Sequence, residues 1–181
     1  MSKVAVVYGT RPEAIKMAPV VSALRQIGID PFVVVTGQHR EMLDQINALF
    51  GIVPDVDLDL GRPGQTLPDI VSRALPALDE AIGHSDAEAV VVQGDTSTTF
   101  VGGLAAFYRQ LPVVHVEAGL RTGKMYSPFP EEINRRLTTH LASLHLAPTV
   151  TNRENLLAEG VDPSSVRVTG NTVIDAFFEV S

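Results

Sequence analysis

The chain has 181 residues, which is enough for one domain of ordinary size with a substantial core. Hydrophobic residues make up 45% and charged residues 19%, the balance of a folded domain rather than a disordered one. A formal net charge of -7 argues against an extended nucleic-acid surface, and the absence of cysteine excludes disulfides, thiolate metal sites and thiol nucleophiles. The apolar run before Gly9 spans only about five residues, too short for a signal peptide or a membrane span. We therefore expect a cytoplasmic protein that binds neither nucleic acid nor membrane.

Short Val-rich runs alternate with longer helical patterns, as is typical of a parallel sheet covered on both faces. The predicted strands are residues 3–8, 31–36, 89–93 and 112–117, with shorter ones near His145 and Val166 and a minor one near Val56. The predicted helices are residues 14–27, 40–50, 67–82, 98–109, 131–144 and 153–159, followed by one that begins at Asn171. The sequence therefore predicts an α/β fold, a Rossmann-like parallel sheet with helices on both faces.

The first predicted strand is followed by "GTRPEA", a helix start. Thr10 and Glu13 have capping-box spacing, and Pro12 suits a first helical turn. Free N–H groups beside Arg11, with Lys16 nearby, would suit an anionic oxygen, although plain helix capping explains the same residues. The Gly-rich pattern GxGxxG is absent.

Polar residues also follow the second predicted strand. Gln38, His39 and Arg40 stand at a turn from strand to helix, where they face either a ligand or solvent. Further along, Gln65 and Thr66 in "LGRPGQTLP" are most simply read as caps of the next helix.

Two carboxylates follow the next pair of strands, at the edge where ligands gather in open parallel sheets. Asp95 comes directly after residues 89–93, although it could equally cap the following helix. Glu117 ends the strand at residues 112–117, and alternation places His115 on the same face. No third residue has the spacing of a metal ligand, so we expect no metal. Repulsion and partial burial would raise the pKa of one carboxyl group, giving an acid and a base.

A third carboxylate begins the helix in "SPFPEEINRRL". Glu131 and Glu132 lie in its first turn, spaced i to i+4 from Arg135 and Arg136. Its apolar residues predict a buried stripe of Ile133, Leu137, Leu141 and Leu144. Ion pairs within the helix would therefore be enough to explain either glutamate. They do not explain why a flexible loop at residues 118–129 joins this helix to Glu117.

Taken together, "GTRPEAIKMAP", "TGQHREMLDQ", "QGDTSTTF", "HVEAGLRT", "SPFPEEINRR" and "VTGNTVIDA" resemble the amino-terminal half of a non-hydrolysing UDP-N-acetylglucosamine 2-epimerase. The resemblance implies one half of a GT-B two-domain architecture, with residues 1–170 as the amino-terminal domain. Residues 171–181 would begin the connection to an absent carboxy-terminal nucleotide-binding domain. That connection would explain why the helix in "NTVIDAFFEVS" has two phenylalanines expected to be exposed and no stop signal.

The resemblance also implies an activity and its residues. The family interconverts UDP-GlcNAc and UDP-ManNAc without a cofactor, by eliminating UDP to give 2-acetamidoglucal and adding it back. Asp95, Glu117 and Glu131 match its catalytic carboxylates, Arg11 and Lys16 match its substrate-binding edge, and Glu132 is left as a structural residue.

The resemblance further implies a homodimer and a second, activating UDP-GlcNAc site. Gln38, Glu41 and Glu131 match positions of that second site, whereas Gly64 stands where an arginine is expected, with Arg62 two residues earlier. Three alternatives are a GT-B glycosyltransferase, a hydrolysing epimerase, and an inactive binding or dimerisation module. We expect the isolated chain to be essentially inactive.

Overall fold

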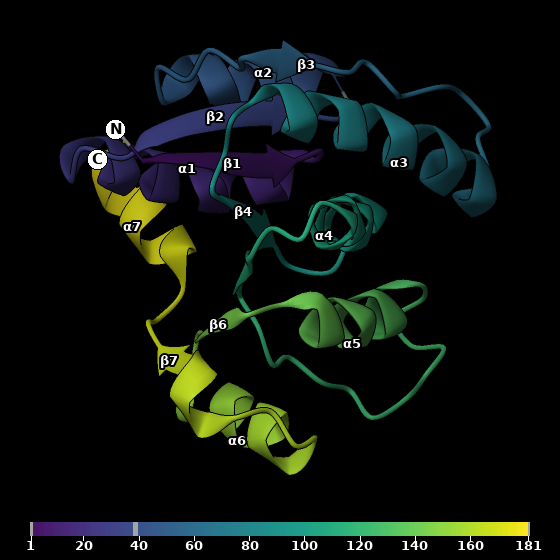
Figure 1. The fold of residues 1–181 in the computed structure, drawn as a ribbon, viewed down its shortest axis with the longest axis vertical. Coiled ribbons are helices and arrows are strands. Elements are labelled where there is room, and N and C mark those ends of the chain that lie inside the picture. The colour runs from purple at the N-terminus through teal and green to yellow at the C-terminus, as the bar shows by residue number, and fades with distance from the viewer. Residues whose placement is uncertain (1, 38–39, 181) are drawn as a thin grey trace.

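The computed structural model describes residues 2–37 and 40–180 and contains one seven-stranded parallel sheet (Figure 1). The strand order is β3-β2-β1-β4-β5-β6-β7, so the chain winds outward from β1 in one direction and from β4 in the other. The strands are β1 (Lys3–Tyr8), β2 (Asp30–Val35), β3 (Val56–Asp57), β4 (Ala89–Gln93), β5 (Val113–Val116), β6 (Leu144–Ala147) and β7 (Val166–Val168). Each predicted strand is present, and the Rossmann-like α/β prediction is confirmed.

The helices follow the strands in alternation. They are α1 (Arg11–Gln26), α2 (Arg40–Leu49), α3 (Leu67–His84), α4 (Ser97–Tyr108), α5 (Glu131–Leu141), α6 (Val150–Ala158) and α7 (Thr172–Glu179), with a short 3₁₀ turn η1 (Pro163–Ser165). Helix α1 begins three residues before the predicted start, because the capping box of Thr10 and Glu13 and the adjacent Pro12 set its first turn at Arg11. None of the helices in the described part of the chain is long and apolar enough to cross a membrane.

The core has two layers, one on each face of the sheet. Residues of β1 alternate between them: Ala5 and Val7 pack with α3 and α4, whereas Val6 and Tyr8 pack with α1 and α2. The central strands are thus buried on both faces, as their continuous apolar sequences predict. This packing fixes the carboxyl ends of β1, β4 and β5 relative to one another.

Helix α5 buries a polar face, which contradicts the predicted apolar stripe. Leu137 is 41% exposed, while the buried residues are Glu132, Asn134, Arg135, Thr138 and Thr139. The physical reason is that this face meets the turn after β4 and the loop before α5, whose polar groups must find partners when buried.

Helix α7 lies beside α1, although the two helices stand at opposite ends of the sequence (Figure 1). Ala176 is its one fully buried residue in the described range, and Phe177 and Phe178 are 66% and 71% exposed. The exposed phenylalanines agree with the sequence-based expectation.

Candidate active site

Asp95 lies in the turn after β4 and is held by α5. Arg135 Nη2 donates to Asp95 Oδ2, and Asn134 Nδ2 donates to the Asp95 carbonyl oxygen at 3.0 Å. The N-cap of α4 is Thr96, whose hydroxyl accepts from Thr99 N at 3.2 Å. Asp95 is therefore not a capping residue, and its side chain is 24% exposed at the edge of the sheet.

His115 fixes the same turn from inside the sheet. Its Nε2 donates to the Gly94 carbonyl oxygen at 2.7 Å, since a carbonyl can only accept. Burial lowers the pKa of His115 to about 4, so the imidazole is neutral near neutral pH. The described residues contain no group of three or more His, Asp or Glu side chains that could hold a metal ion.

Glu117 follows β5 but leaves the geometry of the strand. Strand β5 ends at Val116, and Glu117 has a φ of 65°, in the left-handed region that non-glycine residues rarely occupy. Alternation along the strand therefore does not extend from His115 to Glu117. A Lys16 Nζ–Glu117 Oε2 distance of 2.6 Å defines an ion pair, with the Glu117 side chain 15% exposed. Such backbone conformations cluster at functional sites.

The two carboxylates follow adjacent strands, as predicted. Gln93 of β4 lies opposite Val116 of β5, so Asp95 and Glu117 emerge at the same edge. However, Asp95 is paired with Arg135 and Glu117 with Lys16. Sequence reasoning missed both pairs, because their members lie far apart in the chain and come together only through the strand order.

Glu131 is the first residue of α5 and is partly exposed. Its carboxylate forms no hydrogen bond or ion pair with other residues in the described ranges. The predicted Glu131–Arg135 pair is wrong, because Arg135 instead contacts Asp95 and Glu132, the latter at 3.3 Å. Arg135 thus pairs with the turn after β4 rather than with the first residue of its own helix.

Glu132 is fully buried and holds α5 to the preceding loop. It accepts from Arg136 Nε at 3.0 Å, as the spacing predicted, and from Thr122 N at 3.1 Å. Burial opposes ionisation, but hydrogen bonds from Thr122 and Arg136 and the charge of Arg135 together lower the pKa of Glu132. Its structural role agrees with the sequence analysis.

Arg11 and Glu13 lie at the carboxyl end of β1. Arg11 is exposed as the first residue of α1, and no residue of the described chain pairs with it. Glu13 is 3% exposed, and burial raises the pKa of its carboxyl group, against the effect of its hydrogen bonds. The turn before them has no space for a side chain: a Cβ on Gly9 would lie 2.0 Å from Thr36 Oγ1 and 2.6 Å from Thr98 Oγ1.

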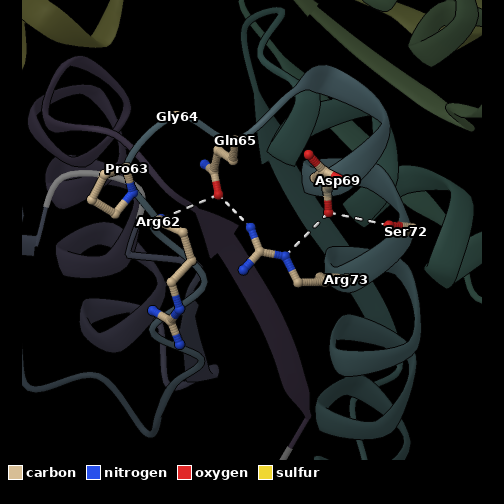
Figure 2. Close-up of a pocket in the computed structure, with 7 residues that line it drawn as sticks. All are labelled: Arg62, Pro63, Gly64, Gln65, Asp69, Ser72 and Arg73. Atoms are coloured by element: carbon tan, nitrogen blue, oxygen red, sulfur yellow. Dashed lines mark hydrogen bonds between the residues drawn. The ribbon is translucent and has the colours of Figure 1, made fainter.

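A pocket of about 330 Å³ lies in the loop between β3 and α3, and none of the three candidate carboxylates lines it (Figure 2). Gln65 Oε1 accepts from Arg73 Nη2 and from Arg62 N, and Gly64 at the tip has a φ of 70°. Thr66 caps α3, as predicted. The predicted Gln38 and His39 lie outside the described residues, as do the side chains of Arg40 and Glu41.

The parallel sheet in this strand order, with polar side chains along its carboxyl edge, is one Rossmann-like half of a GT-B two-domain architecture. The family model described as UDP-N-acetylglucosamine 2-epimerase matches residues 22–181, and the chain belongs to this family.

Individual relatives agree with this assignment. The Escherichia coli (strain K12) UDP-N-acetylglucosamine 2-epimerase is 57% identical over 182 residues, covering 98% of this chain and 48% of that protein. The crystal structure of the Neisseria meningitidis UDP-GlcNAc 2-epimerase bound to UDP-GlcNAc has a TM-score of 0.94 at 51% identity, covering 97% of this chain and 48% of that one. The Methanocaldococcus jannaschii UDP-GlcNAc 2-epimerase in complex with UDP-GlcNAc and UDP has a TM-score of 0.92 at 36% identity, covering 98% and 49%. The chain thus spans about half the length of the relatives it matches.

Proposed function

We propose that this chain is the amino-terminal half of a non-hydrolysing UDP-GlcNAc 2-epimerase and supplies its catalytic carboxylates. The observation that carries the proposal is the pair of carboxylates, Asp95 and Glu117, at the adjacent ends of β4 and β5. In the family to which the chain belongs, relatives have been solved with UDP-GlcNAc and with UDP.

The reaction needs groups that move a proton at C2 of the sugar. In the elimination a base takes the C2 proton, the C–H electron pair forms the C1–C2 double bond, and UDP leaves C1 with its bonding pair. Re-addition of UDP places a proton on the opposite face of C2, so an acid is needed there. Asp95 and Glu117 are our candidates for this base and acid, and Glu131 for support or for contact with a sugar hydroxyl.

The departing diphosphate needs positive charge close to C1. Arg11 is exposed at the amino end of α1, where backbone N–H groups also favour an anion. Lys16 lies one turn further along the same helix, beside Glu117. We therefore assign Arg11 and Lys16 to the substrate-binding edge.

Incubation of the full-length enzyme with UDP-GlcNAc in deuterated water tests this function. We expect UDP-ManNAc to form and deuterium to enter C2 of both sugars, because the groups that remove and return the C2 proton exchange it with solvent. Free ManNAc would instead identify a hydrolysing epimerase, and failure to label C2 would exclude proton transfer there. In the same assay Glu117→Gln should lower kcat by about 100-fold or more with little change in the free energy of unfolding. A loss of kcat accompanied by a matching loss of folding stability would make Glu117 a structural residue.

An activating second substrate site is part of the same proposal, with Gln38, Glu41 and Glu131 as its candidate residues. The pocket of Figure 2 lies in the loop where the family resemblance places an arginine of that site, and Arg62 and Arg73 line this pocket together with Gly64. The cytoplasmic location and the homodimer rest on the sequence and the family resemblance.

A further inference from the structure

The carboxyl group of Glu13 joins two turns that are far apart in the sequence. Its Oε2 accepts from Gly9 N at 2.9 Å and from Thr10 N at 2.8 Å, in the turn that leads to Arg11. Its Oε1 accepts from Thr96 Oγ1 at 2.6 Å, and Thr96 directly follows Asp95. Thr99 Oγ1 lies 3.0 Å from the same oxygen. One side chain therefore contacts both the β1–α1 turn and the β4–α4 turn.

Local roles account for only half of these contacts. The bond from Thr10 N completes a capping box on α1, and the bond from Gly9 N lies in the same turn. The bond from Thr96 and the contact with Thr99 join one loop at this end of the sheet to another, and helix capping requires neither of them. The second carboxylate oxygen thus serves a contact between the two turns.

The capping box of α3 provides a comparison within the same chain. There Asp69 stands in the position of Glu13 and accepts from Thr66, but it is exposed. Glu13 is buried, and none of the cationic side chains in the described ranges forms an ion pair with it. Burying a carboxyl group without a cation is costly unless hydrogen bonds offset it. A capping residue gains nothing from such burial, whereas a residue that holds two turns together must lie between them.

We propose that Glu13 is a positioning residue of this site, which fixes the turn of Asp95 relative to the turn of Arg11 and to the helix that carries Lys16. The role rests on the proposed epimerase function, because Glu13 acts through these three residues. His115 and Asn134 hold the Asp95 turn from its other sides, at Gly94 and at the Asp95 carbonyl oxygen. Glu13 is the contact that ties this turn to α1.

Two substitutions in the full-length enzyme separate positioning from helix capping. Glu13→Asp is one methylene shorter and cannot reach both turns, so we expect kcat to fall about 100-fold, as for a misplacement near 1 Å, with a higher KM for UDP-GlcNAc. Glu13→Gln keeps the length: its carbonyl oxygen accepts from Gly9 and Thr10, and its amide donates to the Thr96 hydroxyl. We expect Glu13→Gln to stay within about fivefold of the wild type, since both contacts survive.

Ser85→Ala is the matched control for a lost buried hydrogen bond. Ser85 is buried at the opposite edge of the sheet, where it donates to the Ile82 carbonyl oxygen at 2.6 Å. Its removal should lower the melting temperature while leaving the KM unchanged. Two results for Glu13→Asp would overturn the proposal. One is a smaller fraction of folded enzyme with an unchanged KM, as in the control. The other is a kcat and a KM equal to those of the wild type.

Hydrogen–deuterium exchange gives a readout that does not depend on activity. In Glu13→Asp the amides of residues 9–13 and of residues 94–99 should both exchange faster than in the wild type and in Ser85→Ala. Faster exchange confined to residues 9–13 would reduce Glu13 to a helix cap. If the wild-type enzyme does not convert UDP-GlcNAc, the proposed function fails, and the exchange result alone decides whether Glu13 joins the turns.

Discussion

His115 acts on the candidate site from within the sheet. Its ring is fully buried on β5, and its one described hydrogen bond goes to Gly94, next to Asp95. Burial favours the neutral imidazole and lowers the pKa of His115 from 6.5 to about 4. Below pH 6.5 the unfolded chain therefore binds a proton that the folded chain excludes, and the free energy of unfolding falls as the pH drops from 6.5 toward 4.

This linkage predicts a pH-dependent effect of His115→Gln. The wild type should lose up to about 3 kcal/mol of stability through His115 across this range, and the variant should lose less, because glutamine does not titrate. Burial also lowers the pKa of His145, so the slope should shrink rather than vanish. Urea denaturation between pH 7 and pH 4 measures how the free energy of unfolding of each protein changes with pH. His84→Gln, at an exposed histidine, is the control. Parallel curves for wild type and His115→Gln would contradict the assignment.

At the scale of single residues, sequence position predicted which carboxylates reach the edge but not what they contact. Asp95 and Glu117 were placed by the ends of their strands, and the structure agrees. Their partners, Arg135 and Lys16, lie on helices whose position depends on the packed sheet. Local spacing assigned Arg135 to Glu131, since helical pairs are visible in a sequence and long-range pairs are not.

Among the elements, α5 departs most from the rule that helices bury apolar residues. Its buried Glu132 contacts Arg135, Arg136 and the backbone of Thr122. Every predicted helix and strand exists, because hydrophobic periodicity and turn residues are local signals. The buried face of α5 could not be predicted in this way, since it is chosen by polar groups of neighbouring loops.

Glu132→Gln should destabilise the protein by about 3 kcal/mol near neutral pH, because it removes the shared anion of two arginines, one of them buried. The pKa of Glu132 is lowered in the folded state, so its contribution is present above pH 4.5 and is lost as the pH falls through the folded-state pKa. The difference between variant and wild type in thermal or urea unfolding should thus narrow in acid. The same substitution at exposed Glu154 on α6 should change stability by less than about 0.5 kcal/mol. Equal effects at the two positions would refute a buried ion-pair role.

At the scale of the whole molecule, we propose that this chain supplies the catalytic carboxylates and that a second half binds the nucleotide. We propose that residues 171–181, which include α7, lead from the domain of residues 1–170 toward that half. The relatives' length fits this division, since the alignment covers 48% of the Escherichia coli protein.

We predict that the isolated 181-residue chain has no measurable epimerase activity, because the proposed cleft requires a second half and lost positioning alone can cost several powers of ten in rate. Mixing it with a separately expressed second half should restore turnover in the UDP-GlcNAc assay. A chain that carries Glu117→Gln should still bind the second half, but the mixture should show no turnover. Ordinary turnover by the chain alone would show that the site is complete within it.

Gly9 sets a limit on how this edge can evolve. The hydroxyls of Thr36 and Thr98, which are hydrogen-bonded to each other at 2.9 Å, fill the space that a methyl group on Gly9 would take. The end of β1, the end of β2 and the start of α4 therefore meet at one point with no spare volume. A side chain at Gly9 would have to displace the side chains of Thr36 and Thr98. We therefore expect substitutions at Gly9 to be poorly tolerated, because any side chain there must move both threonines.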